Sequence, residues 1–342
     1  MMQLEIRSSP NLDLLCLMNV LTGDPWYISY HEQAFQHFGK TLSFASRLCL
    51  KMVTTVSHSN MISAWATWIV STVPDFESGK MSDLLKDTKT LWRTLSQHDQ
   101  LESKWKAWLR TAIGLKLLAV VAREVEMHDF GDYWQEQYLP KIQVRQDELS
   151  RWLIQYELDS EIESMLGLGR APESITLYLC GLTEPHGIRI SGLRFITGVS
   201  NSNEVVFGNL IHEMFHPPYD RRHLQKDGSV LENDPLVKES FRTKKPQYGY
   251  PTMFGFIEEN IVEAMAVFVA AKLGLEKDPM SYFANHDEGS HKLSVVLFRA
   301  FKQYPKPREQ SFEQYFQELL RTLPVGSLDG LYQAIQHRCL GI

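Results

Sequence analysis

The sequence has few cysteines and no excess of positive charge, and each shortage excludes a class of protein. Its 342 residues include only four cysteines, which lie far apart and form no Cys-x-x-Cys pair. The sequence therefore indicates neither a disulfide framework nor a cysteine zinc site. Lysine and arginine number 35 against 41 acidic residues, which gives a formal net charge of −6. This balance gives no electrostatic reason to expect a nucleic-acid partner.

Long apolar runs and a leader segment are also missing. The most apolar windows, Met61–Val73 and Ala112–Ala122, are too short to span a bilayer. The first ten residues contain Glu5 and Arg7 and no apolar core, so we expect no signal peptide. A hydrophobic content of 44% is ordinary for a globular protein with a sizeable core. We therefore expect a cytoplasmic protein that does not associate with a membrane.

The first half of the chain has the apolar spacing of helices almost throughout. Before it, Gln3–Arg7 alternates apolar and polar residues, which predicts a short half-buried strand. Asn11 can cap the first helix, and the sequence Gly-Asp-Pro after it can end that helix. The expected helices are Asn11–Leu21, Tyr27–Phe38, Leu42–Val56, Ser59–Val73, Ser82–Leu95, Leu101–His128 and Val144–Leu166.

The pattern changes near Gly167. Three segments, Ile175–Cys180, Ile188–Ile190 and Leu193–Val199, have strand propensity and are separated by turn residues. The last of these can bind an extended peptide if it lies at an exposed sheet edge, although a purely structural strand is the alternative. We expect the chain to divide here, into a helical region of residues 1–166 and a second region of residues 167–342.

Two histidines and a glutamate stand together in the stretch Phe207–His216. His212 and His216 are four positions apart, so on a helix they share one face and their imidazoles can reach a single cation. Glu213 lies about 100° round the helix from His212, where it would miss the ion and reach a water bound to it. The other positions in this stretch are mostly apolar, which indicates a buried helix. Polar or charged side chains are rarely buried unless a partner such as a metal ion compensates for the loss of water. This spacing suits a zinc hydrolase.

Proline follows the second histidine directly. Because a residue before proline is pushed out of the α region, we expect the helix to end at His216. The span Pro217–Pro251 is polar and charged, which predicts a long loop with at most short helices. Towards the C-terminus, the spacing predicts the helices Lys292–Tyr304, Ser311–Leu323 and Ser327–Cys339.

A catalytic zinc site commonly has three protein ligands, so a third is needed. The downstream histidine of the HExxHxxGxxH pattern is missing, because Tyr219 and Arg222 occupy the glycine and histidine positions. Glu259 and Glu263 are four positions apart within an otherwise apolar helix. Such a buried acidic pair needs cationic or hydrogen-bonding partners. Zinc would bind one of the two carboxylates. The other carboxylate would accept a hydrogen bond from the second ring nitrogen of a ligand histidine. Glu258 remains a competing ligand.

These two helices resemble those of the gluzincins, zinc peptidases with HExxH on one helix and a glutamate ligand on the next. The match lies in Ile211–Pro217 and Glu259–Ala264, and it covers residues 174–275 in all. The His-Pro step and the Glu-x-Ile-Val-x-Ala pattern are most similar to a bacterial group of predicted peptidases.

Together with the helical pattern of the N-terminal half, the resemblance predicts an α+β fold that is mostly α. Residues 167–342 would then be a zincin-like catalytic lobe, with a small sheet beside the HExxH helix and the glutamate helix. It also implies that Glu213 is the general base and that Glu263 stands where an aspartate often orients a ligand histidine. One Zn²⁺ per chain is implied, on the ligands His212, His216 and Glu259.

The oxyanion that forms during amide hydrolysis also needs a stabilising donor. Tyr250 stands nine positions before Glu259 and resembles the tyrosine ahead of the glutamate ligand in thermolysin-like enzymes. His286 is the other candidate, and His291 is a third. Most tyrosines and histidines in loops are structural, so the sequence leaves this role open.

We therefore expect a zinc metallopeptidase that hydrolyses peptides or proteins through a zinc-bound water. Two alternatives remain: a zinc hydrolase of a non-peptide amide or ester, and a non-catalytic, zinc-stabilised binding protein. Glu213 argues against the second, because a structural zinc site needs no base. The sequence leaves the substrate, the choice between endo- and exo-action, and the oligomeric state open.

Overall fold

The computed structural model describes residues 3–57, 61–95, 105–167, 169, 174–216, 221–245 and 252–339. Within these residues the fold is α+β and mostly α, with one four-stranded sheet, as the sequence predicted. The chain forms two compact units. Unit 1 comprises Met1–Gln3, Ile154–Ile175 and Ser202–Ile342, and unit 2 comprises Leu4–Leu153 and Thr176–Asn201.

Unit 2 contains the helices of the N-terminal half. Two expected helices are broken: the first at His31, which precedes a π-helical turn, and the second at Asp87. The Asp87 carboxylate accepts a hydrogen bond from the backbone N–H of Thr90 at 3.0 Å, so it starts a new helix instead of continuing the old one. The helices are α1 (Pro10–Leu21), α2 (Pro25–Tyr30), α3 (Glu32–Ala34), α4 (Phe44–Ser57), α5 (Ile62–Val70), α6 (Met81–Lys86), α7 (Thr88–Leu95), α8 (Trp105–Met127), α9 (Phe130–Gln137) and α10 (Leu139–Leu153).

The sheet has the strand order β1-β2-β4-β3, where the strands are β1 (Gln3–Arg7), β2 (Ser174–Cys180), β3 (Ile188–Ile190) and β4 (Arg194–Gly198). Strand β4 pairs in parallel with β2, where Phe195 lies opposite Leu177, and antiparallel with β3. All four strands occur where the sequence predicted them. The idea that β4 offers an edge to a peptide is wrong, because β4 lies between two other strands.

Hydrogen bonds tie the sheet region to the N-terminal helices. The backbone N–H of Ser191 donates to the hydroxyl of Ser71 at 2.8 Å, and that of Leu182 donates to the Asp13 carboxylate at 2.8 Å. The division expected at residues 166 and 167 therefore differs from the units that the packing defines. The small sheet, expected in one lobe with the HExxH helix, packs with the N-terminal helices instead.

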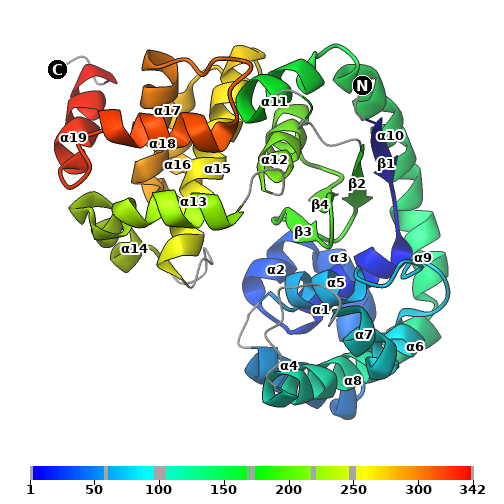
Figure 1. Cartoon of the computed structure of the whole chain (residues 1–342). Coiled ribbons are helices and arrows are strands. Elements are labelled where there is room, and N and C mark those ends of the chain that lie inside the picture. Colours follow the sequence, from blue (N-terminus) through cyan, green and yellow to red (C-terminus); the bar gives the residue numbers. More distant parts are fainter. Residues whose placement is uncertain are drawn as a thin grey trace. The chain divides into compact units, whose positions relative to one another are not determined.

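Unit 1 is built round the long helix α15 (Met253–Lys272), against which α12 (Asn203–Phe215) and α17 (Lys292–Gln303) pack (Figure 1). The expected Val144–Leu166 helix ends early in unit 2, and its last part is the separate α11 (Leu158–Leu166) of unit 1. The stretch expected as a loop with at most short helices contains two short helices, of 8 and 9 residues, in its described part. The remaining helices are α13 (Arg221–Gly228), a 3₁₀ turn (Ser229–Asn233), α14 (Pro235–Thr243), α16 (Pro279–Asn285), α18 (Phe312–Thr322) and α19 (Leu328–Cys339).

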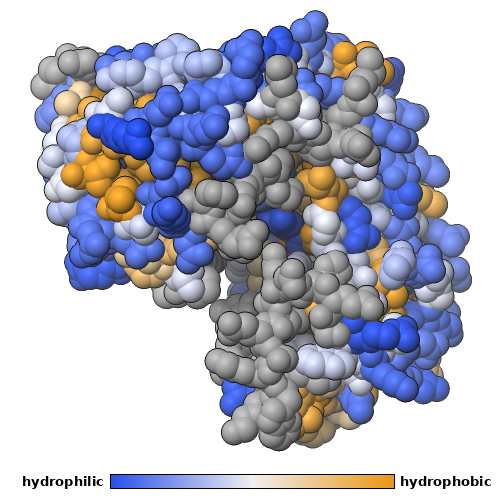
Figure 2. All heavy atoms as spheres, in the orientation of Figure 1, coloured by the Kyte–Doolittle hydropathy of each residue, from blue (hydrophilic) through white to orange (hydrophobic). Residues whose placement is uncertain are grey.

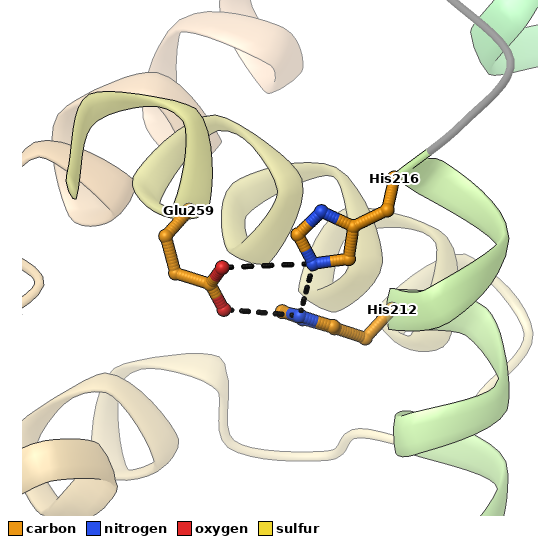
Figure 3. Close-up of side chains that lie close together, drawn as sticks. All are labelled: His212, His216 and Glu259. Carbon is orange, nitrogen blue, oxygen red and sulfur yellow. Dashed lines mark hydrogen bonds and ion pairs between the residues drawn. The ribbon is translucent and has the colours of Figure 1, made fainter. Parts of the chain in front are cut away.

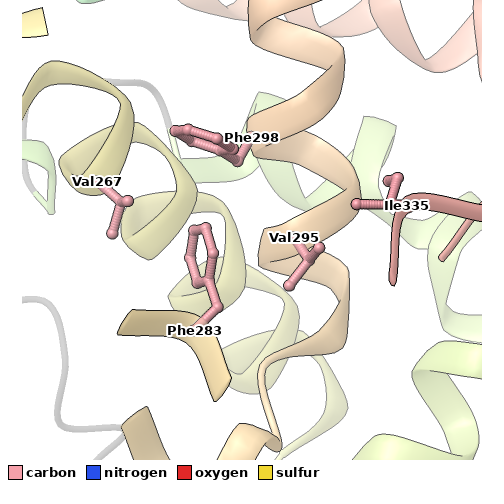
Figure 4. Packing of buried hydrophobic residues seen from close by; sticks show 5 residues of the cluster. All are labelled: Val267, Phe283, Val295, Phe298 and Ile335. Atoms are coloured by element: carbon pink, nitrogen blue, oxygen red, sulfur yellow. The ribbon is translucent and has the colours of Figure 1, made fainter. Parts of the chain in front are cut away.

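An apolar cluster fixes α15, α16, α17 and α19 against one another. Figure 4 shows Val267, Phe283 and Phe298 facing one another on one side of α17, with Ile335 on its other side. Each buried side chain of this size stabilises the fold by about 1.5–3 kcal/mol. Three of these helices, α15, α16 and α17, lead directly into the polar residues described below. The cluster consists of Val267, Phe283, Val295, Phe298 and Ile335.

The surface in Figure 2 is mostly hydrophilic, and its apolar side chains gather in a few small areas. Among the described residues, large apolar side chains that are more than four-fifths exposed are Phe44 and Ile154. Searched over the described residues, none of the helices has the length and apolar character needed to cross a membrane.

Candidate metal centre

The helix α12 presents the two histidines of the motif. It begins where the Ser202 side chain accepts a hydrogen bond from the backbone N–H of Val205, and it ends at Phe215, with His216 as its C-terminal cap. The apolar residues between the two histidines are buried, and the histidines themselves are only partly exposed. The helix therefore ends at the second histidine, as the following proline predicted.

The helix α15 is held in place on both sides of Glu259. Its first turn is capped by the Thr252 hydroxyl, which accepts from the backbone N–H of Gly255 at 3.1 Å. The neighbouring Asn260 is fully buried and accepts a hydrogen bond from the Ser294 backbone N–H at 3.2 Å, while the Ser294 hydroxyl donates to the Asn260 carbonyl at 2.9 Å. These bonds lock α15 to α17 and so fix the direction of Glu259.

The two helices bring His212, His216 and Glu259 together (Figure 3). Nε2 of His212 lies 3.0 Å from Oε1 of Glu259 and 3.0 Å from Nε2 of His216. Nε2 of His216 lies 3.5 Å from Oε2 of Glu259. Three potential ligand atoms thus converge on one point between the helices. Their side chains are 10–17% exposed.

These separations fit a zinc ion. Bonds of 2.0–2.1 Å in tetrahedral geometry place neighbouring ligand atoms about 3.4 Å apart. Nδ1 of His212 lies 2.9 Å from the Glu263 carboxylate, which fixes the proton of a neutral ring on that nitrogen. Nε2 of His212 then carries a lone pair, and it faces Nε2 of His216 and a carboxylate oxygen. Such a group of electron donors is favourable when a cation lies among them.

Electrostatics at this cluster favours a positive charge. Burial by itself lowers the pKa of His212, but the charges and hydrogen bonds of Glu259 and Glu263 outweigh it and raise this pKa well above its usual value. Burial raises the pKa of both glutamates, yet that of Glu259 is lowered by His212 and His216, and that of Glu263 is lowered to about 2. The two carboxylates therefore stay ionised and stabilise a cation beside them, either a protonated imidazole or a metal ion.

A further layer surrounds Glu263, which is only 2% exposed. Its Oε1 lies 3.9 Å from Nε2 of His286, and the Tyr282 hydroxyl helps to lower its pKa. Tyr282 and His286 are four positions apart, and their rings stack with an angle of 12° between planes. Glu263 thus connects His212 to a second group of polar side chains.

That second group consists of His286, Asp287 and His291, whose ligand atoms lie within 4.8 Å of one another. Nε2 of His291 is 3.2 Å from Oδ2 of Asp287. His291 is 1% exposed, and its ring lies edge-on to that of Phe256 at 5.8 Å. The described part of the chain therefore holds two groups of side chains that can bind a metal ion.

The remaining candidates from the sequence lie in different places. Glu213 is half-buried on α12 and stands outside the group of three ligand atoms, as a general base would. Glu258 is buried but does not join the group, so the carboxylate that lies beside the two histidines is that of Glu259. His286 contacts Glu263 rather than the three ligands. Tyr250 lies outside the described residues.

The sequence analysis missed Tyr282 and Asp287. A signal for both was present, since Tyr282 stands four positions before His286 and Asp287 four before His291. This spacing has a weak meaning on its own, because many such pairs occur in helices without any shared ligand.

Comparison of the chain with protein-family models, with curated proteins and with solved structures gave no match.

Proposed function

We propose that the protein is a zinc metallopeptidase. The observation that carries the proposal is the convergence of His212, His216 and Glu259 on one partly exposed point, with Glu213 directly after the first of them. Two imidazoles and one carboxylate are a ligand set used by catalytic zinc sites that keep a position open for water. A structural zinc site is usually closed by four protein ligands, whereas the described residues supply three to this cluster.

Each residue has a distinct task in this proposal. His212, His216 and Glu259 would hold the ion, and Glu263 accepts the Nδ1–H of His212 and so fixes its ring orientation. A bound zinc ion supplies a Lewis acid that lowers the pKa of a water and polarises a carbonyl group. Glu213 removes one proton from the attacking water.

The protons and bonds balance in this scheme. A new C–O bond forms to the substrate carbonyl carbon and the C–N bond breaks. Glu213 passes the proton that it took from water to the leaving amine, and so returns to its ionised state. For the developing oxyanion we retain Tyr250 as the donor to test, because His286 lies against Glu263 instead.

Hydrolysis of a non-peptide amide or an ester uses the same residues and stays a second candidate. It needs no change in the roles of the ligands or the base. Trials with peptide, amide and ester substrates separate the two. A binding protein without catalysis has no use for Glu213 beside the ligands.

The first experiment measures the zinc content of the protein and of Glu259→Ala by mass spectrometry, after purification without chelator or metal-affinity resin. We expect the wild type to bind zinc at this cluster and the variant to hold one zinc ion fewer per chain. Hydrolysis of a peptide library is then compared between the wild type and Glu213→Gln. The variant should keep its zinc and lose at least about 100-fold in kcat, since general-base catalysis contributes about 10²–10⁴-fold.

Glu204→Gln is the matched control, because Glu204 is an exposed acid in the first turn of the same helix. It should retain both zinc and activity. Undiminished hydrolysis by Glu213→Gln would refute the assigned base. A wild-type protein that contains no zinc and also fails to take up added zinc would refute the proposal of a zinc metallopeptidase.

A further inference from the structure

A second group of imidazoles and carboxylates lies behind the candidate active site. It is formed by the turn between α16 and α17, which contributes His286, Asp287 and His291. Its ligand atoms lie within 4.8 Å of one another. The rings of the two histidines are 5.4 Å apart and nearly perpendicular, at 82°, so both can direct a nitrogen toward a shared point.

Glu263 adds a fourth ligand atom at this place. One of its oxygens, Oε2, faces Nδ1 of His212 at 2.9 Å. The other, Oε1, is buried, lies 3.9 Å from Nε2 of His286 and has no hydrogen-bond partner within 3.5 Å among the described residues, although the Tyr282 hydroxyl is near enough to lower the pKa of this carboxyl. A buried carboxylate oxygen without a partner is costly, and a cation beside it removes that cost.

The backbone of the turn is held in an unusual conformation that places these groups together. Asp287 and Glu288 both have left-handed φ angles, 43° and 55°, which cost a non-glycine residue about 1–2 kcal/mol each. The Glu288 carboxylate pairs with Lys245, and the Ser290 backbone N–H donates to the Asp287 carbonyl at 3.2 Å. This strained backbone places the Asp287 carboxylate beside the buried ring of His291.

We propose that His286, Asp287, His291 and Oε1 of Glu263 form a second binding site for a divalent transition-metal ion such as zinc. Two imidazoles and two carboxylates suit a first-row ion, whereas calcium and magnesium prefer oxygen ligands alone. The ion neutralises the buried Glu263 carboxylate and ties the turn to α15.

This site is distinct from the candidate catalytic site but joined to it through one side chain. Glu263 would bind the second ion with one oxygen and hold the ligand His212 with the other. The second ion therefore supports the orientation of His212 and has no direct contact with a substrate at the first site. The proposal does not depend on the protein being a peptidase.

The test is a titration of the metal-stripped full-length protein with Zn²⁺, with bound metal counted by mass spectrometry after gel filtration. We expect two ions per chain in the wild type and one in Asp287→Asn. Asparagine has the same size and tolerates a left-handed φ, so the turn is preserved. Glu259→Ala should also bind one ion, and the double variant none.

Glu288→Gln is the matched control, since Glu288 shares the left-handed turn but its carboxylate faces Lys245. It should bind two ions. A Co²⁺ titration adds a spectroscopic check, because the visible absorption of the second equivalent should vanish in Asp287→Asn and persist in Glu288→Gln.

One ion in the wild type would overturn the proposal, as would equal stoichiometry in the wild type and Asp287→Asn. In those cases His291 and Asp287 are a hydrogen-bonded pair without metal. Failure of the peptidase proposal is separate, because it is read from hydrolysis by Glu213→Gln and from zinc loss in Glu259→Ala.

Discussion

Two buried carboxyl groups, Asp13 in unit 2 and Glu263 in unit 1, have pKa values that are shifted in opposite directions. Both are almost inaccessible to solvent, at 0% and 2% exposure. Burial raises the pKa of Asp13 to about 7, and the hydrogen bonds from Trp134 and the backbone only partly oppose this rise. The pKa of Glu263 is instead lowered to about 2, because His212 and His286 outweigh the effect of burial.

The difference lies in the partners. Asp13 accepts hydrogen bonds from Nε1 of Trp134 at 2.6 Å and from the backbone N–H of Leu182 at 2.8 Å, and neither donor can ionise. Glu263 faces imidazoles, which can carry a proton or bind a metal ion with the opposite nitrogen. A buried acid among fixed N–H donors joins structural elements, whereas one among histidines indicates a site for a cation.

The largest expected effect that tests this contrast is the loss of stability in Asp13→Ala. Two buried N–H donors would lose their acceptor, at about 1–3 kcal/mol each, and a small cavity would be added. We expect the free energy of unfolding to fall by about 4–5 kcal/mol in urea denaturation at pH 5. Glu263→Ala with chelator present should cost less, about 1–2 kcal/mol, because its imidazole partners can release protons. Equal losses in the two variants would remove the contrast.

A smaller effect is expected on the pH dependence of stability. The folded-state pKa of Asp13, about 7, lies above its unfolded value of 3.8. The folded chain therefore binds more protons, so this stabilising contribution is complete below pH 4 and is lost as the pH rises through 7. The loss should reach up to about 4 kcal/mol at about 1.4 kcal/mol for each pKa unit.

The control for this prediction is Asp13→Asn, which cannot titrate. His186 acts in the opposite direction, because burial lowers its pKa to about 4, so the wild-type curve alone is not decisive. The difference between the two unfolding curves, measured from pH 4 to pH 8, isolates Asp13. A constant difference over this range would show that the carboxylate is already ionised at low pH.

The smallest of the three effects concerns metal affinity in Glu263→Gln. Removing the carboxylate that orients a ligand histidine typically weakens metal binding by about 10–100-fold. We expect this loss at the first zinc site, measured by competition with a zinc-binding dye. Glu258→Gln is the control, because Glu258 is buried on the same helix but outside the cluster. Unchanged affinity in Glu263→Gln would indicate that Glu263 serves only the second group.

The sequence predicted which residues lie together at the first group, His212, His216 and Glu259. The spacing of four residues in both pairs, His212 with His216 and Glu259 with Glu263, places side chains on one helix face whatever the rest of the fold does. The structure brings these pairs together, while the roles assigned to them stay predictions. The break at Asp87 was missed, because an apolar pattern continues across it and only the side-chain cap to Thr90 ends the helix.

Contacts between residues far apart in the sequence were predicted less well. The strands were located correctly, but the sequence did not reveal that β4 is interior or that the sheet packs with the N-terminal helices. Strand propensity reports local conformation and carries no information about which neighbour a strand pairs with. The bonds from Leu182 to Asp13 and from Ser191 to Ser71 connect residues more than 100 positions apart.

By itself the sequence determined the strands, most of the helical segments and the two i, i+4 pairs, because these depend on interactions within a few residues of one another. Only the tertiary structure decided that α15 turns Glu259 rather than Glu258 toward the histidines, and that Asp287 and His291 lie behind Glu263. The packing of α15 against α12 and α17 fixes the rotation of that helix about its axis, and side-chain packing over such distances is a property of the whole fold.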